Sequence, residues 1–168
     1  MTRNFNKVAA VALASAFVFT AGSAVAAQRQ LAQVGAWRAI VADQGAGRVC
    51  FVIASPKERL PATLKRDPGF AFVTKRGGSW EISFDFGYRL AQAQHSLQIG
   101  ASAHKLFSKG AAAWLATDVE ERRVVEEMKA GQEMQVSAKS GRGNDTTDVY
   151  DLAGFTAATA AVDKECGR

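Results

Sequence analysis

The chain is poor in the residues that build metal centres and redox sites. Its 168 residues include two cysteines and two histidines. No Cys-x-x-Cys pair is present for dithiol chemistry, and a structural zinc site needs four ligands. The candidate ligands Cys50, His95, His104 and Cys166 are mostly far apart in sequence. The sequence therefore predicts neither a metal site nor another cofactor.

Long hydrophobic runs are also scarce, and the single long one lies near the start. Residues 8–22 are uncharged and mostly apolar, follow a basic segment and precede the small residues SAVAA. This three-part arrangement is typical of a secretory signal peptide. The run is shorter than the roughly 20 residues that a membrane-spanning helix needs. We expect residues 1–27 to be removed, with cleavage after Ala26 or Ala27, and the protein to reach the periplasm or the outer cell surface.

The expected mature chain, residues 28–168, has little excess charge. Cleavage removes two basic residues and no acidic ones, which leaves 19 Lys and Arg against 16 Asp and Glu, a net charge of +3. A chain of about 140 residues is expected to form a single domain without a transmembrane segment. Its basic residues are dispersed, which favours a solvated surface with weak association with an anionic envelope surface at most. No dense basic stripe or nucleic-acid-binding module is present, so nucleic acid is not an expected partner.

In an exported chain, the two cysteines favour a disulfide over a free thiol. An even count in an oxidising compartment predicts pairing. Cys50 lies in the apolar run VCFVI, which is typical of a buried strand, and Cys166 lies two residues from the C-terminus. A bond between them closes a loop of about 115 residues, for which the chain-entropy model gives roughly 4–5 kcal/mol of stabilisation.

Short strands dominate the rest of the sequence. In residues 80–89, WEISFDFGYR, apolar and polar side chains alternate with the period of two that marks a strand with one buried face. Many short candidates with glycine-rich turns between them predict an antiparallel β-sandwich or a flattened barrel. The other candidates are residues 35–42, 48–54, 70–75, 96–100, 104–108, 112–116, 133–139 and 146–152.

Two segments have helical periodicity instead. Residues 117–131 begin with Thr117 and Glu120 at capping-box spacing and carry a narrow apolar stripe. A second helix starts near Phe155, where Val162 and Cys166 fall on the same face as Phe155 at 100° per residue. The C-terminal helix is therefore expected to be tethered by the disulfide to a core strand.

No residue pattern points to catalysis. Ser102 lies in GASAH, which lacks the second glycine and the strand-to-helix context of a nucleophile elbow, so a hairpin turn is expected there. His95 and His104 have no adjacent carboxylate and are expected to be exposed at strand ends. No carboxylates are placed as an acid/base pair. The sequence indicates a non-enzymatic binding or structural protein.

Four segments resemble the invasion-associated locus B family of exported proteobacterial proteins. They are residues 34–56, which contain the Trp37 strand and Cys50, residues 66–76, residues 110–116, and residues 140–166, SGRGNDTTDVYDLAGFTAATAAVDKEC. The resemblance implies a small exported β-rich domain with a disulfide between Cys50 and Cys166. It brings no catalytic residues. The positions that characterise the matching segments, to which we assign structural roles, are Trp37, Arg142, Asp148, Tyr150, Gly154 and Phe155.

These observations lead to one main hypothesis and two alternatives. The main hypothesis is an exported, non-enzymatic protein that binds an envelope or host protein of unknown identity. The first alternative is a periplasmic accessory or stability factor without a host role, and the second is an enzyme with an unrecognised site. Arg142 and Asp148 flank GNDTT, residues 143–147, at hairpin-like spacing and are expected to form an ion pair across it.

Overall fold

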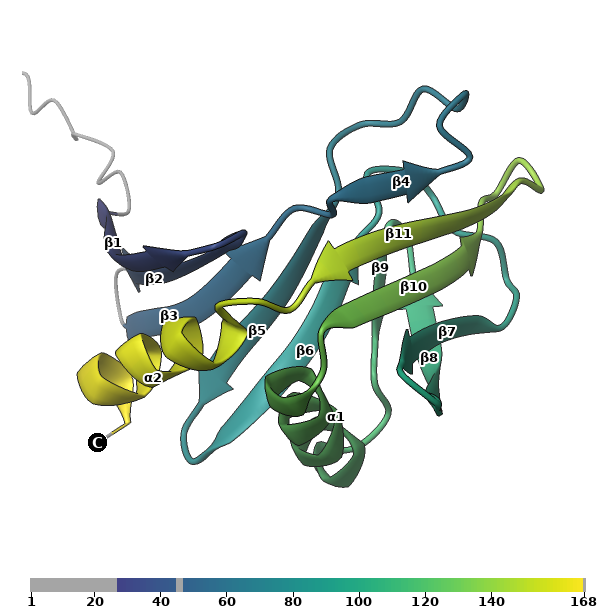
Figure 1. Ribbon diagram of the computed structural model, residues 1–168. Coiled ribbons are helices and arrows are strands. Elements are labelled where there is room, and N and C mark those ends of the chain that lie inside the picture. Colours follow the sequence, from purple (N-terminus) through teal and green to yellow (C-terminus); the bar gives the residue numbers. More distant parts are fainter. Residues whose placement is uncertain (1–26, 45–46, 168) are drawn as a thin grey trace, which may run out of the picture.

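The computed structural model describes residues 27–44 and 47–167, and this part of the chain is mainly β-structure with two helices (Figure 1). The predicted signal peptide, residues 1–27, lies outside the described residues apart from Ala27. Neither described helix has the length and apolar character needed to cross a membrane. The elements are β1 (Ala27–Val34), β2 (Trp37–Gln44), β3 (Gly47–Ala54), β4 (Glu58–Leu60), β5 (Phe70–Arg76), β6 (Ser79–Asp85), β7 (His95–Ile99), β8 (Ser102–Lys109), β9 (Ala112–Trp114), α1 (Asp118–Ala130), β10 (Glu133–Lys139), β11 (Asp145–Asp151) and α2 (Phe155–Cys166).

The strands of the described region form one antiparallel sheet, in the order β1-β2-β3-β5-β6-β9-β8-β7-β10-β11-β4. The sheet bends strongly, so that β10 and β11 lie in front of β6 and β9 in Figure 1. The rings of Phe84 in β6 and Tyr150 in β11 are 6.2 Å apart, although four strands separate β6 from β11 in the sheet. The predicted antiparallel sandwich or flattened barrel is confirmed, and one continuous sheet supplies both of its halves.

Strand β6 shows why the sequence folds into this sheet. Its side chains alternate as predicted, and those at even positions from Trp80 to Phe86 are buried. The strand ends at Asp85, four residues before the predicted end. The reason lies at Gly87, whose φ of +68° is left-handed and where a Cβ atom would lie 2.3 Å from the carbonyl oxygen of Asp67. The chain turns there because only glycine fits both constraints.

Helix α1 forms as its sequence predicts. The Thr117 hydroxyl accepts a hydrogen bond from the backbone N–H of Glu120, which is the N-cap bond of the predicted capping box. The same hydroxyl donates to the Glu120 carboxylate. The helix packs against β6. Its buried apolar stripe consists of Val124, Val125 and Met128.

Helix α2 closes the other end of the molecule. It follows Gly154, whose φ is +90° and where a Cβ atom would lie 2.3 Å from the carbonyl oxygen of Val34. Its apolar face packs on β1, β2 and β3, with Phe155 and Val162 fully buried as expected. The predicted disulfide between Cys50 and Cys166 is present, with 6.5 Å between the two Cα atoms.

Two strands were missed by the sequence analysis. Residues 28–33, which show no strand pattern in the sequence, belong to β1, which pairs with β2 with a register shift between Gln30 and Ala32. Strand β4 pairs with β11 through residues Glu58–Leu60. Both are edge strands with largely polar, exposed side chains, so neither shows the alternation that reveals a half-buried strand.

Candidate interaction surface

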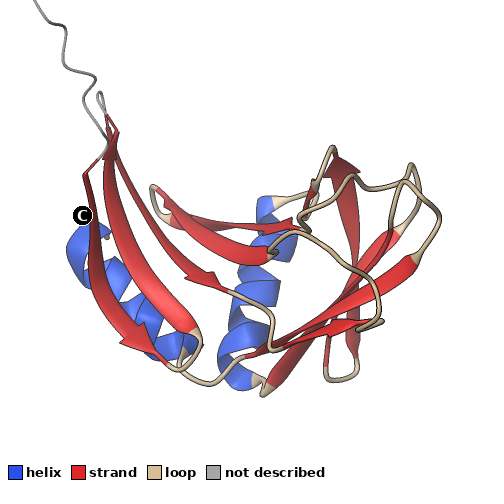
Figure 2. Cartoon of the chain, turned by 90° about the horizontal axis from the view of Figure 1, so that it is seen from above, coloured by secondary structure: helices blue, strands red, loops and turns tan. Residues whose placement is uncertain are grey.

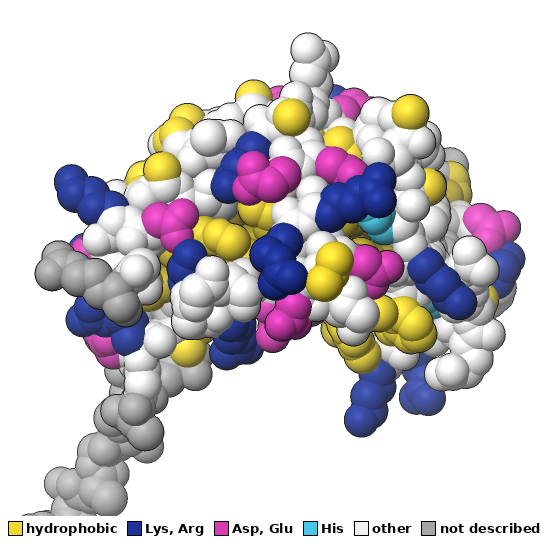
Figure 3. Space-filling model, turned by 90° about the horizontal axis from the view of Figure 1, so that it is seen from below, with side chains coloured by type: hydrophobic (Ala, Val, Ile, Leu, Met, Phe, Trp, Pro, Cys, Tyr) yellow, Lys and Arg dark blue, Asp and Glu magenta, His cyan; other side chains and the backbone are white. Residues whose placement is uncertain are grey.

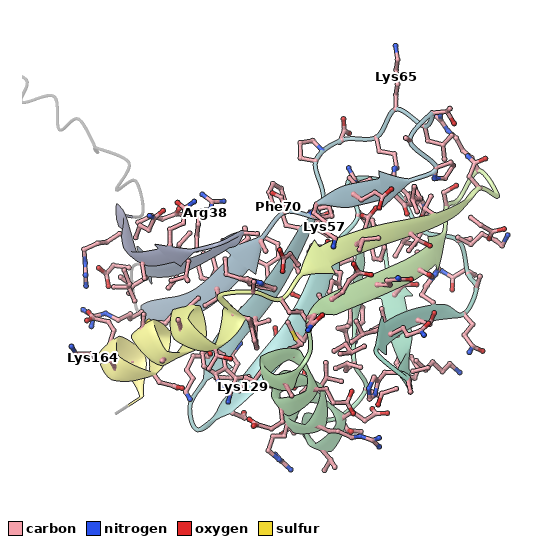
Figure 4. All side chains as sticks on the ribbon, viewed as in Figure 1. Arg38, Lys57, Lys65, Phe70, Lys129 and Lys164 are labelled. Carbon is pink, nitrogen blue, oxygen red and sulfur yellow. A yellow bond between two sulfur atoms is a disulfide. The ribbon has the colours of Figure 1, made fainter. Side chains whose placement is uncertain are left out.

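One face of the β2–β3–β5 region is covered by the protein itself, whereas the other is open. Apart from neighbouring strands, α2 is the element with extensive contacts to β2 and β3. Figure 2 shows α2 lying along one side of these strands. Figure 4 shows Arg38 of β2 and Phe70 of β5 on the side of the sheet away from α2. Successive side chains of a strand point to opposite faces, so the second face takes every alternate residue.

Large apolar side chains line the open face. In register, Ile53 of β3 lies opposite Phe72 of β5, and Phe72 lies opposite Ser83 of β6. The same row continues from Ser83 to Trp114 of β9 and then to Phe107 of β8. We call this surface the aromatic face. Its apolar members are Ile40 and Ile53, which are buried, and Phe51, Phe70, Phe72, Phe107 and Trp114, which are partly exposed.

The aromatic side chains cover one another only in part. The ring centroid of Phe72 lies 6.0 Å from that of Phe51 and 6.1 Å from that of Phe70, in tilted arrangements. These distances are typical of favourable aromatic contacts. Phe107 at the far end is 47% exposed, and the Lys105 ammonium lies 5.7 Å from its ring centroid. A contiguous, partly exposed apolar surface of this kind is a feature of interaction sites.

Charged groups border the aromatic face on one side. A groove of about 390 Å³ beside Trp114 is lined by the acidic residues Glu81, Asp118 and Glu121. Burial raises the pKa of Glu121, although a hydrogen bond from the Ile82 N–H opposes this effect. Figure 3, a view from below, shows hydrophobic side chains at the surface beside a hollowed edge, with basic side chains on either side. An apolar centre with a charged rim is the usual composition of a protein–protein interface.

Four of the six residues that characterise the family resemblance lie elsewhere, at the junction of β2, β11 and α2. The Trp37 indole N–H donates to the carbonyl oxygen of Asp151 at 2.8 Å, and its ring packs edge-on against Phe155 at 4.8 Å. Tyr150 and Phe155 are buried, and Gly154 supplies the left-handed turn between them. These contacts are consistent with structural roles for the residues at this junction.

Asp148 has different partners from the one expected. The sequence placed it in an ion pair with Arg142, but its buried carboxylate is bound by Arg59 at 3.2 Å and by Arg66 at 2.8 Å. The prediction was wrong because side chains alternate along β11. Asp148 points into the molecule, whereas Arg142 is exposed in the turn between β10 and β11.

The histidines are not exposed at strand ends as expected. His95 is buried, accepts a hydrogen bond from the backbone N–H of Lys139 at Nδ1, and lies with Nε2 3.2 Å from the carbonyl oxygen of Ala91. His104 Nε2 lies 2.7 Å from a carboxylate oxygen of Glu127 on α1. Their partners come from segments distant in sequence, so local context could not reveal them.

Two further predictions concern Ser102 and a metal site. Ser102 is the first residue of β8 and pairs with Ile99 of β7, so it lies at the predicted hairpin. Within residues 27–44 and 47–167, no group of three His, Cys, Asp or Glu side chains is placed to hold a metal ion.

These features define a class: a small antiparallel β domain with two helices, the second joined to a core strand by a disulfide. Residues 37–163 match the family model for the invasion associated locus B (IalB) protein. The chain therefore belongs to the IalB family.

A solved structure has the same fold. The crystal structure of invasion associated protein B from Bartonella henselae is similar to this chain with a TM-score of 0.59 and 14% sequence identity. The match covers 80% of this chain and 95% of that one. No curated protein matches the sequence.

The aromatic face was missed by the sequence analysis, although a signal for it was present. The run VCFVI was predicted to be a buried strand, and FAFV to be part of a strand over residues 70–75. In a strand with one face in water, apolar residues should alternate with polar ones, as they do in 80–89. The two runs show no such alternation. Continuous apolar runs in an otherwise antiparallel domain therefore indicated a second apolar face.

Proposed function

We propose that the protein is an exported, non-enzymatic member of the IalB family that binds another envelope or host protein through the aromatic face. The observation that carries this proposal is the row from Ile53 to Phe107 on the face opposite α2. Three of its large apolar side chains, Phe72, Trp114 and Phe107, are partly exposed. Leaving such side chains in water forgoes burial energy of about 25 cal/mol per Å² of apolar area. A partner that covers them recovers it.

Export is supported by the sequence of residues 1–27 and by the pairing of Cys50 with Cys166, which suits an oxidising compartment. The name of the Bartonella henselae relative associates that protein with invasion. For this chain, a host protein and a second envelope protein are both partners that the aromatic face would fit, and identification of the partner separates them.

The test compares two double variants in intact cells after chemical crosslinking and affinity capture. Phe51→Gln with Phe72→Gln makes the aromatic face polar at its centre. Gln98→Ala with Gln135→Ala is the matched control, because these exposed residues lie opposite each other on β7 and β10, away from that face. We expect the wild type and the control to recover the same partner, and the phenylalanine variant to recover at least tenfold less.

Each variant must first show an unchanged thermal unfolding midpoint to within a few degrees and no free thiol after denaturation. Equal recovery of the partner by all three proteins would contradict the proposal. Recovery of only a second copy of the chain would replace it with self-association. Addition of protease to intact cells then distinguishes a surface protein from one held in the periplasm.

A further inference from the structure

A second candidate site lies where three loops meet, and it shares no residue with the aromatic face. Residues 64–67, 87–89 and the turn between β10 and β11 enclose a groove of about 660 Å³. In Figure 1 this turn lies at the far end of the molecule from α2. The volume falls within the range of small-molecule sites, about 300–1,000 Å³.

The groove is strongly basic. Four cationic side chains line it (Lys65, Arg66, Arg89 and Arg142), against one acidic residue, Asp67. Within the described residues, the three cations other than Arg66 have no carboxylate within salt-bridge distance. Elsewhere on the protein, basic side chains are commonly paired, as with Lys75 and Asp163 at 2.6 Å. The excess of positive charge is therefore local to the groove. It is not visible in the total charge of the protein, which is nearly balanced.

The floor of the groove also holds a buried charge that is only partly compensated. The Arg66 side chain is 6% exposed and its Nη1 atom donates to Asp148 Oδ1 at 2.8 Å. Asp148 accepts from Arg59 as well, so one carboxylate serves two guanidinium groups. Arg59 finds further acceptors in the carbonyl oxygens of Asp67 and Phe86, at 2.6 and 2.7 Å.

Arg66 is less well satisfied than Arg59. Its second terminal nitrogen has only the carbonyl oxygen of Leu60, at 3.4 Å. A buried charge without full compensation is costly. An anion in the groove beside Arg66 supplies the missing negative charge, and a planar guanidinium binds phosphate oxygens in pairs.

An aromatic side chain accompanies these cations. Tyr88 lines the groove, its hydroxyl group is hydrogen-bonded to Thr146, and the Arg66 guanidinium carbon lies 5.9 Å from its ring centroid. Burial raises the pKa of Tyr88, so its hydroxyl group stays protonated. Ser140 and Asn144 also line the groove and add polar groups to it. A sugar offers both a C–H face for an aromatic ring and hydroxyl groups for polar side chains.

We propose that this groove binds a phosphate-bearing sugar, with the phosphate held by Arg66, Arg89 and Arg142 and the sugar ring placed near Tyr88. Such a sugar can come from a free phosphorylated oligosaccharide or from the headgroup of a phosphoglycolipid. The proposal is independent of the aromatic face, because the two surfaces are made by different residues.

The test measures affinity by calorimetry with trehalose 6-phosphate, unphosphorylated trehalose and inorganic phosphate. We expect trehalose 6-phosphate to bind most tightly and trehalose not to bind. Arg89→Gln with Arg142→Gln removes two exposed cations without touching the buried Asp148 cluster, and should weaken binding at least tenfold. Arg122→Gln with Lys164→Gln makes the same change in net charge on the exposed surfaces of α1 and α2, and should leave the affinity unchanged.

A sedimentation assay with vesicles separates the two sources. Preference for vesicles that contain lipid A, a phosphorylated disaccharide lipid, over vesicles of phosphatidylglycerol supports the lipid-borne sugar. Binding of trehalose 6-phosphate alone supports the free sugar. Three results would overturn the proposal. Both double variants could weaken binding equally, inorganic phosphate could bind as tightly as the phosphosugar, or the wild type could bind neither sugar source. The Phe51→Gln/Phe72→Gln variant should bind the phosphosugar normally.

Discussion

The two faces of the β2–β3–β5 sheet carry apolar side chains of very different size. Beneath α2 they are mostly small: Ala39, Val41, Cys50, Val52, Ala54, Ala71 and Val73. On the open face they are large: Ile40, Phe51, Ile53, Phe70 and Phe72. Small side chains allow a helix to approach the sheet closely, and the helix contributes small residues of its own, including Ala158 and Thr159.

This difference in side-chain size indicates that the two faces of the sheet have different roles. The face beneath α2 is closed by covalent and ionic links within the chain, namely the Cys50–Cys166 disulfide and the pair of Lys75 with Asp163. The aromatic face has large rings that contact each other and, at its end, water. Partly exposed rings add little to the stability of a sheet by itself, whereas they are useful on a binding surface.

The largest expected effect comes from breaking the link on the covered face. Cys50→Ala with Cys166→Ala should lower the free energy of unfolding by about 4 kcal/mol, because the bond closes a loop between residues 116 apart in sequence and restricts the unfolded chain. Urea denaturation followed by circular dichroism measures the loss. A reductant should destabilise the wild type by a similar amount and leave the double variant unaffected. A loss below 1 kcal/mol would show that α2 holds to the sheet without the bond.

The next largest loss of stability is expected at a core phenylalanine, compared with one on the opposite face of the neighbouring strand. Phe84 of β6 faces the core and is 1% exposed, whereas Phe72 of β5 belongs to the aromatic face. Phe84→Ala should cost about 3–5 kcal/mol through the cavity that it leaves. Phe72→Ala should cost only about 1 kcal/mol, since its ring is partly in water already. Chemical denaturation measures both, and equal losses would mean that the aromatic face is a second core.

Much of the fold could be predicted from the sequence because its causes are local. The alternation of 80–89, the capping box of Thr117 and Glu120, and the phasing of α2 are each visible within a few residues. The disulfide followed from an even cysteine count and from the direction of Cys166 on its helix. The edge strands β1 and β4 were not predicted, because an edge strand forms by pairing with its neighbour. Such pairing does not require alternating apolar and polar residues in its own sequence.

The sites were harder to predict because they depend on contacts between distant segments. Asp148 meets Arg59 and Arg66, more than 80 residues away, across β4 and the loop that follows it. The groove cations Arg89 and Arg142 come from separate turns, and total charge averages them with the rest of the surface. The row from Ile53 to Phe107 exists only once the order of strands is known.

The smallest expected effect on stability concerns Glu121, at the border of the aromatic face. Its side chain binds a backbone N–H at the edge of β6. Strand β6 pairs with β9 only from Ser83 to Asp85, and just before this pairing the Ile82 N–H donates to the carboxylate of Glu121 on α1 at 3.3 Å. Burial raises the pKa of Glu121, so the folded state holds its proton more tightly than the unfolded state does. The contribution of this group to stability therefore grows as the pH falls through the raised pKa.

Glu121→Gln removes the buried charge and keeps an oxygen that accepts from Ile82. It should raise the free energy of unfolding at pH 7 by less than about 1 kcal/mol, and the gain should vanish below about pH 4, where the wild-type carboxyl is protonated. Glu127→Gln on the same helix is the control of opposite sign. Burial favours a higher pKa there, but hydrogen bonds from His104 and Arg123 outweigh it and lower the pKa. Glu127→Gln should therefore reduce the free energy of unfolding at pH 7. If Glu121→Gln reduced it by a similar amount, the ionised carboxylate of Glu121 would be stabilising the edge of β6.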